Sequence, residues 1–468
     1  MDVVLRLTGE QHALLKAHLY TGDGNEAAAV ILCGRCAGES RHCLTARQII
    51  PVPYNQCSTR TPVRVTWSTD VLLPHLSEAA KRGLAVVKIH SHPGGLEKFS
   101  EWDDASDHDL FASVYGWMDN EYPHASAIML PDGRIFGRVV TLAGEFEPLS
   151  MVSIVGDDLH FWLPLEKIAH VREFARRHAQ AFGAGTAAIL SRLTVAVIGA
   201  SGTGSPIIEQ LARLGVRKLI LVDPDRVEEK NLNRILNATM GDARNGVFKV
   251  EMLARAIRRM GLGTEVVTFA RNLFDPELVR AVAQADIVIG SMDSIDGRFL
   301  LNKLATFYVL PYFDVGIKLE ADGHGGVEQI CGTVHYLQPG RSSLLSRRMF
   351  TLEQVRAAGL RRTDPAAYKE QLRSKYIVGA QEDRPAVISV NMLFAAMAVN
   401  ELLARLHTYR DDGNADFAEY GLSLTQVQFY NESEGQPCRI LARHLGRGDV
   451  RPLLEMAELS DGSTEKAA

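Results

Sequence analysis

The stretch LTVAVIGASGTGSPIIEQLARLGVRKLILVDPD, residues 193–225, decides the fold of the C-terminal part of this 468-residue chain. The apolar run LTVAVIG leads into the glycine-rich turn ASGTGS, then into PIIEQLARLG with helical spacing, and then into the second apolar run KLILVDPD. This order of strand, turn, helix and strand predicts a βαβ unit of a parallel sheet. A further helix–strand alternation ends in ADIVIGSMD at 285–293 and predicts a doubly wound α/β fold.

The glycine-rich turn predicts a phosphate-binding loop. Gly199, Gly202 and Gly204 let backbone N–H groups approach an anion, and the N-terminus of the following helix favours negative charge. Asp223 ends the next strand about twenty residues on, where a carboxylate binds a ribose hydroxyl in dinucleotide-binding folds. Ser201 stands where those folds carry their second glycine. The glycine pattern alone would suggest NAD or FAD, and it is an imperfect match.

The residues after the second strand favour ATP over a redox cofactor. LVDPDRVEEKNLNR places several polar side chains in one turn, NGVFKVE adds a lysine, and IVIGSMD brings a carboxylate to the end of another strand. An adenylating enzyme needs such a set, because it binds Mg²⁺-ATP, stabilises the charge on the leaving pyrophosphate and directs a carboxylate to the α-phosphate. The residues in question are Asp223, Asp225, Asn231, Arg234, Lys249 and Asp293.

This set resembles the ThiF/MoeB and ubiquitin-activating enzyme family, whose signature D-x-D-x-V-x-x-x-N-L-x-R is matched in full. The resemblance covers about residues 170–410. It implies that Asp223 binds ribose, that Asn231, Arg234 and Lys249 contact the phosphates, and that Asp293 holds magnesium. The segment RHAQAFG matches the family's entry segment, in which Arg177 reaches ATP across a homodimer.

By this resemblance Arg234 and Lys249 are also catalytic. The full set of expected nucleotide-binding residues is Gly199, Gly202, Gly204, Asp223, Asp225, Asn231, Arg234, Lys249 and Arg177.

The chain departs from that family at its cysteines. Many relatives have a catalytic cysteine and two C-x-x-C zinc motifs, but after HYLQPG this chain has Ser342, Ser343 and Ser346 where the first zinc pair is expected. The segment KYIVGAQEDRPAVISVNML also contains no cysteine. Cys331 lies in the strand-like VEQICGTVHYL and Cys438 lies near the end of the fold, and we assign a catalytic role to neither. We therefore expect no acyl transfer to a cysteine of this domain. Either the adenylate is handed directly to a nucleophile of a partner, or a serine of this arginine-rich stretch is activated to form an oxyester.

The N-terminal part contains the second chemical motif, KIHSHPGGLEKFSEWDD at 88–104. In a strand, residues i and i+2 point to one face, so His90 and His92 can converge on one metal ion. Asp103 at the start of the next helix can supply a third ligand. Three protein ligands leave a position for water, which is the arrangement of a catalytic zinc site. Ser100 can donate a hydrogen bond to the oxyanion of a tetrahedral intermediate.

The pattern H-x-H, seven residues, Ser, two residues, Asp resembles the JAMM motif of the JAB/MPN metalloprotease family, which includes deubiquitinating isopeptidases and bacterial relatives. The resemblance covers roughly residues 1–145 and implies a mixed sheet. The family also has a glutamate base at the start of its first core strand, and Glu26 in GNEAAAVILCG is the match. A zinc nucleobase deaminase is excluded, because it requires H-x-E and a later P-C-x-x-C.

Cys33 and Cys36 form a C-x-x-C, with Cys43 and Cys57 following. A structural zinc site or a redox pair has this local form. Cys33 falls inside an apolar strand, however, where a free cysteine packs as a small hydrophobic residue. The spacing to the later cysteines fits no zinc module, so we interpret these cysteines as packing residues.

Further elements follow from periodicity. In the N-terminal part the predicted strands are AAAVILCG, VRVTWS, LAVVKIH, ASAIML and RIFGRVV, and the predicted helices are GEQHALLKAHL, VLLPHLSEAAKRG and ASDHDLFASVYGW. We expect an isopeptidase-like domain over 1–150, a connector with helical entry over 151–190, the ATP-binding domain over 191–440, and a flexible tail over 441–468.

Composition and net charge limit the classes of partner that this chain can have. The chain is 46% hydrophobic and 23% charged with a formal net charge of −5, so it has no electrostatic signature for nucleic acid or a membrane surface. We expect no secretory signal and no transmembrane helix, since no uninterrupted apolar run of about 18 residues occurs. Six cysteines are too few for a disulfide framework. The expectation is a cytoplasmic protein.

Together the two resemblances imply a bifunctional enzyme of a bacterial ubiquitin-like pathway, with Zn²⁺, Mg²⁺ and ATP as cofactors. One domain would adenylate the C-terminus of a ubiquitin-like protein, which a separate conjugating enzyme would use, and the other would cleave its precursor or conjugates. The alternatives are a scaffold with inactive sites and a sulfur-carrier adenylating enzyme. The complete ligand sets count against the scaffold, and the missing cysteines count against sulfur transfer.

Overall fold

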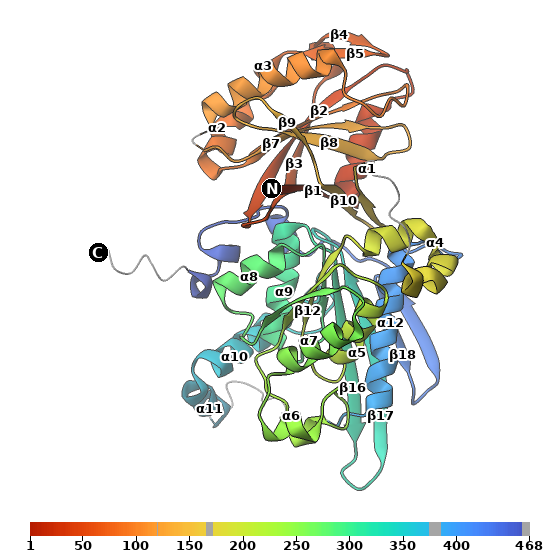
Figure 1. Cartoon of the computed structure of the whole chain (residues 1–468). Helices are drawn as coiled ribbons and strands as arrows, with labels where there is room; N and C mark the ends of the chain where they lie inside the picture. The colour runs from red at the N-terminus through yellow and green to blue at the C-terminus, as the bar shows by residue number, and fades with distance from the viewer. Residues whose placement is uncertain (119, 165–171, 374–384, 461–468) are drawn as a thin grey trace. The chain divides into compact units, whose positions relative to one another are not determined.

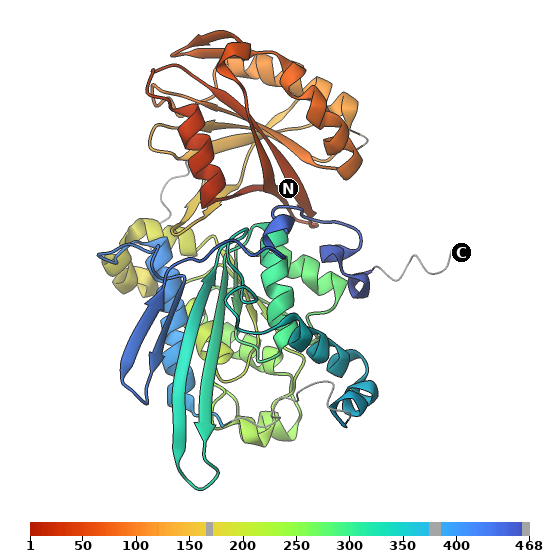
Figure 2. The ribbon, with the colours of Figure 1, turned by 180° about the vertical axis from the view of Figure 1, so that it is seen from behind.

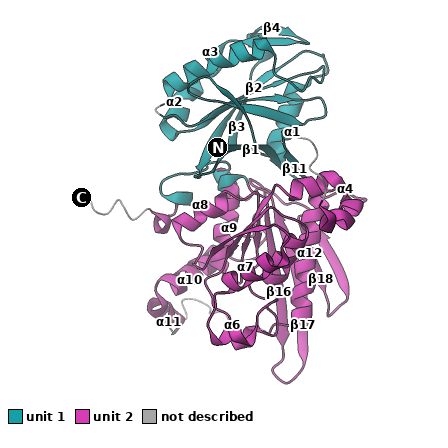
Figure 3. Cartoon of the chain, viewed as in Figure 1, with its two compact units in different colours: residues 1–167, 307–309, 444–454 teal, residues 168–306, 310–443, 455–468 magenta. Residues whose placement is uncertain are grey.

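The computed structural model describes residues 1–118, 120–164, 172–373 and 385–460 (Figure 1). The chain divides into two compact units (Figure 3). Unit 1 comprises Met1–Lys167, Phe307–Val309 and His444–Leu454. Unit 2 comprises Ile168–Thr306, Leu310–Arg443 and Glu455–Ala468.

Unit 1 is built on a nine-stranded mixed sheet, as the resemblance implied. β1 pairs in parallel with both β3 and β10, and β6 with β7, whereas the other neighbours are antiparallel. In sheet order the strands are β11 (Leu159–Trp162), β10 (Met151–Val155), β1 (Asp2–Thr8), β3 (Arg41–Pro51), β2 (Ala28–Ala37), β6 (Ala85–Ser91), β7 (His124–Met129), β8 (Ile135–Val140) and β9 (Phe146–Pro148). A separate hairpin consists of β4 (Cys57–Thr61) and β5 (Arg64–Trp67).

Helices cover both faces of this sheet, because the apolar residues of its central strands alternate between two cores. Ile31 belongs to the core that includes Leu15 of α1 (Gly9–Leu19). Its neighbour Val30 belongs to the opposite core, with residues of α2 (Leu73–Arg82) and α3 (Glu101–Trp117) such as Phe111. The predicted strands and helices of this part are confirmed, whereas β1, β3, β4, β9, β10 and β11 were not predicted.

Unit 2 has an eight-stranded sheet whose first five strands are parallel, which confirms the predicted Rossmann-like fold. The remaining strands form an antiparallel extension, seen from behind in Figure 2. In sheet order the strands are β14 (Glu265–Phe269), β13 (Lys218–Val222), β12 (Thr194–Ile198), β15 (Ile287–Gly290), β16 (Tyr312–Ala321), β17 (Val327–Leu337), β18 (Glu419–Ser423) and β19 (Gln428–Glu432).

The helices of this part of the chain are α4 (Arg176–Leu190), α5 (Gly204–Arg213), α6 (Met240–Arg244), α7 (Lys249–Met260), α8 (Pro276–Ala283), α9 (Ile295–Tyr308), α10 (Leu352–Thr363), α11 (Pro365–Arg373) and α12 (Ile388–Leu406). Of the helices in the described ranges, α12 is long and apolar enough to cross a membrane by length and composition. Since 67% of that segment is buried and α12 packs against α5, β16 and β17, it has the surroundings of a core helix.

The expectation of a flexible tail from residue 441 needs correction. Residues 444–454 group with unit 1, and Gly446 and Gly448 lie directly against the backbone of its sheet. The Gly34 N–H donates to the Gly446 carbonyl at 3.1 Å. Residues 461–468, the end of the expected tail, lie outside the described residues. The segment was misjudged because it has no periodic pattern of its own and its contacts are with residues some 400 positions earlier.

The expected boundary at residue 150 also falls inside the sheet of unit 1, since β10 and β11 follow it and pair with β1 and with each other. The expected helical entry corresponds to α4, which is interrupted at Gly183 (φ 80°, ψ 157°).

Candidate active sites

The three expected zinc ligands converge at one end of β6. His90 belongs to β6, and the His92 N–H donates to the Met129 carbonyl at 3.1 Å, which continues the extended pairing with β7. Both histidine rings therefore lie on one face of the strand. Asp103 lies in the first turn of α3, whose N-cap is Ser100.

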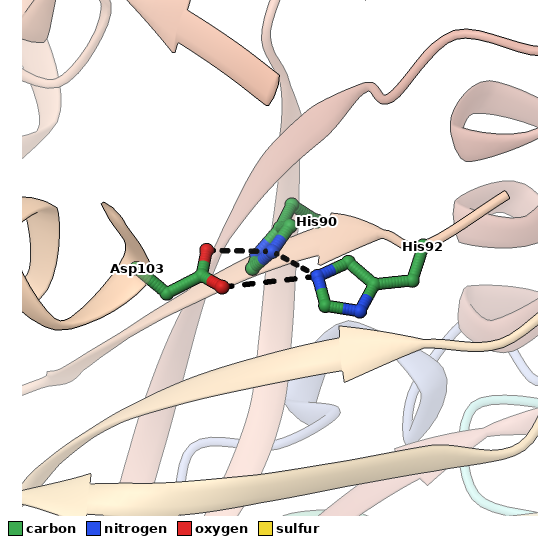
Figure 4. Close-up of side chains that lie close together, drawn as sticks. All are labelled: His90, His92 and Asp103. Carbon is green, nitrogen blue, oxygen red and sulfur yellow. Dashed lines mark hydrogen bonds and ion pairs between the residues drawn. The ribbon is translucent and has the colours of Figure 1, made fainter. Parts of the chain in front are cut away.

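Figure 4 shows these side chains pointing toward one another. The Nε2 atoms of His90 and His92 are 3.1 Å apart, and the Oδ1 atom of Asp103 lies 3.0 Å from His90 Nε2. The other carboxylate oxygen of Asp103 is 3.8 Å from His92 Nε2. All three donor atoms lie within 4.8 Å of one another.

These distances fit a zinc ion. A tetrahedral ion about 2.0–2.1 Å from each of two ligand atoms separates those atoms by about 3.3 Å. The His90–His92 and His90–Asp103 separations of 3.1 and 3.0 Å are close to that value. Two imidazoles and one carboxylate are also a donor set that zinc prefers.

The surroundings keep the ligands in a metal-binding state. Burial lowers the pKa of His90, despite its hydrogen bond with Asp103, so the imidazole is neutral at pH 7. Burial opposes the charge on Asp103, but its hydrogen bonds with His90 and Ser100 prevail, and its pKa lies below the usual range. The Nδ1 atom of His92 lies 2.7 Å from the Leu96 carbonyl, which requires the proton on Nδ1 and leaves the Nε2 lone pair for a metal.

Glu26 lies beside this cluster, just before β2. Its carboxylate is 4.0 Å from His92 Nε2, and the residue is 6% exposed. Burial, together with the negative charge of Asp103, raises the pKa of Glu26 to about 8. A carboxyl group with a pKa near neutrality is suited to take and return a proton.

Ser100 has a structural role that the sequence motif does not reveal. Its hydroxyl accepts a hydrogen bond from the Asp103 N–H at 3.2 Å and donates to Oδ2 of the same residue at 2.7 Å. This capping box orients the Asp103 carboxylate. The role of Ser100 as an oxyanion donor stays a prediction.

The expected phosphate-binding loop of unit 2 connects β12 to α5. Gly199 has φ 95°, and a Cβ atom on Gly204 would lie 1.9 Å from the Gly199 carbonyl oxygen. Glycine is therefore required at both positions. The loop is tied to the next strand, because the Ala200 N–H donates to the Asp223 carboxylate at 2.8 Å.

A cluster of ion pairs lies at the carboxyl end of β13, with Lys249 and Asp223 buried and Asp225 exposed. Lys249 is 5% exposed. Its Nζ atom lies 2.7 Å from a carboxylate oxygen of Asp225 and 3.8 Å from one of Asp223. Burial raises the pKa of Asp223, although Lys249 counteracts it. The structure thus brings together three of the expected nucleotide-binding residues, with the lysine paired to carboxylates.

Arg234 and Asn231 occupy the turn after β13. The Arg234 side chain packs over Gly202, where a Cβ atom would be 3.0 Å from its Cδ atom. Arg234 also donates to the Lys230 carbonyl at 2.9 Å. Asn231 is buried, and its Oδ1 atom accepts from the Glu228 N–H at 3.0 Å.

Sequence reasoning missed Asn391 of α12, which also contacts this loop. Its Nδ2 atom lies 3.0 Å from the Thr203 hydroxyl, and its Cγ atom would be 3.2 Å from a Cβ on Gly202. Its Oδ1 atom is buried and has no hydrogen-bond partner among the residues that the structure describes. No local pattern could have identified it, because 188 positions separate it from Thr203.

Asp293 and Arg177 are less constrained. Asp293 is exposed in the loop between β15 and α9, and Arg177 is exposed in the first turn of α4. Their roles at magnesium and across a homodimer stay predictions.

The serines that replace the expected cysteines form hydrogen bonds within the fold. Ser342 and Ser343 are buried, Ser342 pairs with Glu434, and Arg347 Nε donates to the Ser342 hydroxyl at 2.8 Å. Ser346 bonds back to Ser343. Ser342 and Ser343 are thus buried within the fold, whereas Ser346 is exposed.

Residues 175–440 match the sequence model of the ThiF family, and residues 10–132 match that of the prokaryotic homologs of the JAB domain. The first match covers more than half of the chain, which therefore belongs to the ThiF family. The chain is a fusion of a JAB domain and a ThiF domain, as the two sequence motifs had indicated.

Among curated proteins, the chain is 35% identical over 113 residues to the adenylyltransferase and sulfurtransferase MOCS3 of Mus musculus, over 24% of each chain. It is 33% identical over 117 residues to the SAMP-activating enzyme E1 of Haloferax volcanii, over 25% of this chain and 43% of that protein. The chain thus spans less than half the length of these relatives. A crystal structure of E. coli MccB is 17% identical with a TM-score of 0.43, over 62% of this chain and 76% of that one.

Proposed function

We propose that this chain is a bifunctional enzyme of a ubiquitin-like pathway. Its ThiF domain adenylates the C-terminal carboxylate of a ubiquitin-like protein, and its JAB domain is a zinc-dependent isopeptidase that cleaves the precursor or conjugates of that protein. The observation that carries the proposal is that one chain holds both a converged His90–His92–Asp103 triad and a glycine loop beside a buried aspartate–lysine cluster.

In the JAB domain, His90, His92 and Asp103 would hold the zinc ion, which supplies an acidified water and polarises the scissile carbonyl. Glu26, whose carboxylate lies 4.0 Å from His92 Nε2, takes in its ionised form the proton of the attacking water and returns it to the leaving amine. Ser100 keeps the Asp103 carboxylate oriented through the capping box.

In the ThiF domain, the glycine loop and the N-terminus of α5 receive the phosphates of ATP, and Asp223 receives the ribose. Lys249, which lies 2.7 Å from Asp225, contacts the phosphates. Arg234 beside Gly202 stabilises the leaving pyrophosphate, and exposed Asp293 binds Mg²⁺.

The partners follow from the same proposal. They are the ubiquitin-like protein, a separate conjugating enzyme that receives it, and a second copy of the chain whose Arg177 completes the ATP site. The setting is a bacterial cytoplasm, with no role for nucleic acid or a membrane.

The adenylate passes directly to a nucleophile of a partner. Burial raises the pKa of the Cys331 thiol, and Cys438 is buried, so neither is poised as a thiolate. Incubation of the chain with ATP and the ubiquitin-like protein is expected to give no thiol-labile adduct under denaturing conditions. An adduct that reductant removes and that Cys331→Ala abolishes would contradict this prediction, and a thiocarboxylate product would favour sulfur-carrier activation instead.

Separate assays test the two activities. His90→Ala with His92→Ala is expected to abolish zinc content and cleavage of a ubiquitin-like fusion while ATP–pyrophosphate exchange persists. Asp293→Ala is expected to abolish partner-dependent exchange while cleavage persists. A wild-type protein with no bound zinc refutes the first assignment, and tight NADH binding without any effect of ATP refutes the second. Failure of both would favour a scaffold.

A further inference from the structure

Arg138 of β8 contacts α3 on both sides of the segment that carries Asp103. Its guanidinium lies between the rings of Phe99 and Phe146, at 3.9 and 3.7 Å from their centroids. Phe99 directly precedes Ser100, the N-cap of α3. The same guanidinium donates twice to Asp107, at 2.7 and 3.1 Å, and also pairs with Asp104. One side chain therefore holds the residue before the N-cap and the first two turns of the helix.

Lys88 adds a second constraint from β6. Its ammonium pairs with Asp107, and the two residues are 4% and 0% exposed. Lys88 and His90 are two apart on a strand, so their side chains share a face, and Asp107 and Asp103 are four apart on a helix, so theirs do too. The strand–helix contact thus has two parallel pairs, Lys88–Asp107 and His90–Asp103.

Stability alone gives no reason for such a group. Burying ionised side chains costs free energy, and hydrophobic residues of similar size often give equal or greater stability. Buried ion pairs do fix relative orientation, because their partners must meet at hydrogen-bonding distance. The site that needs a fixed orientation here is the one in which Asp103 must reach the two histidines.

We propose that Arg138, acting with Lys88 through Asp107, is a positioning residue for the metal site. It holds the first turn of α3 so that Asp103 faces His90 and His92 before any metal binds. This inference rests on the proposed zinc chemistry, but it concerns residues that touch neither metal nor substrate.

The test is the zinc affinity of the full-length chain, measured by competition with a chelating dye at fixed pH. Arg138→Met leaves Asp107 paired with Lys88, so no buried carboxylate loses its only cation. We expect this variant to bind zinc about 10- to 100-fold more weakly than the wild type, the range seen when groups that orient metal ligands are removed. The matched control is Arg82→Met, which removes an exposed arginine paired with Glu78 on α2 and should change the affinity less than twofold.

Arg138→Lys keeps the charge but loses the planar fork, so it should bind zinc less tightly than the wild type and more tightly than Arg138→Met. It also serves as the test if Arg138→Met does not fold. In the zinc-free protein, Arg138→Met should speed amide exchange in the first turn of α3. A folded variant of Arg138 with zinc affinity within twofold of the wild type overturns the inference. A wild type without zinc affinity refutes the proposed zinc function itself, and the two failures are thereby distinguished.

Discussion

Gly34→Ala is expected to destabilise unit 1 strongly, because β2 at this position lies against the backbone of residues 446–447. A Cβ atom on Gly34 would be 2.3 Å from the Gly446 carbonyl oxygen and 2.5 Å from the carbonyl carbon and oxygen of Arg447. These are backbone atoms, which cannot rotate away. Either β2 or the returning segment must therefore shift by about an ångström, well beyond the adjustment that ordinary van der Waals contacts allow.

The cost has two parts. Overpacking of this kind typically costs about 1–3 kcal/mol. The shift also weakens two hydrogen bonds to the Gly446 carbonyl, from the Gly34 N–H and the Thr45 hydroxyl, each 3.1 Å long. Each contributes about 0.5–1.5 kcal/mol. We therefore expect a loss of about 2–6 kcal/mol, a large part of the roughly 5–15 kcal/mol that stabilises a typical domain.

Tryptophan fluorescence measures this loss selectively. The chain has four tryptophans, all within residues 1–167 of unit 1: Trp67, Trp102, Trp117 and Trp162. Urea unfolding followed at these residues should shift to lower denaturant in Gly34→Ala. Gly116→Ala is the control, because a Cβ there has open space in a helix and should be neutral or stabilise by up to about 1 kcal/mol. A Gly34→Ala midpoint equal to that of the wild type would refute the reasoning.

Three further predictions concern the sites and the fold. Glu26→Gln should keep its zinc but lose at least about 100-fold in cleavage rate, since it removes only the proton acceptor; metal analysis with a cleavage assay checks this, and full activity would remove Glu26 from the mechanism. Gly202→Ala should displace Arg234, whose Cδ would lie 3.0 Å from the new methyl group, and lower pyrophosphate exchange at least about tenfold, with unchanged exchange as the contrary result. Burial, with Arg35 nearby, lowers the pKa of His124 to about 3, so the folded state binds fewer protons than the unfolded state below pH 6.5. The stability of unit 1 should then fall by up to about 1.4 kcal/mol per pH unit as pH drops from 6.5 to 5; His124→Gln should flatten this slope in urea titrations, and an equal slope in both proteins would contradict it.

Local patterns were sufficient for several features of this protein. The helix Gly9–Leu19 and the strand Ala85–Ser91 follow from hydrophobic patterns over a few residues. The turn from Gly199 to Gly204 follows from steric demands of the backbone, which only glycine meets at these positions. His90, His92 and Asp103 are close in sequence, so the strand face and the helix start were enough to bring them together.

Only the tertiary structure decided the contacts between distant segments. β10 belongs to the sheet because it pairs in parallel with β1. Residues 444–454 belong to unit 1 because the backbone of Gly446 lies directly against the backbone of Gly34 and Ala46. Asn391 contacts the glycine loop, and Arg138 forms hydrogen bonds with Asp107 of α3. Both residues lie in elements that carry no sequence motif. Secondary structure depends on interactions between near neighbours, which a sequence pattern records. Partners across hundreds of residues are selected by chain closure and packing, and no local pattern encodes them.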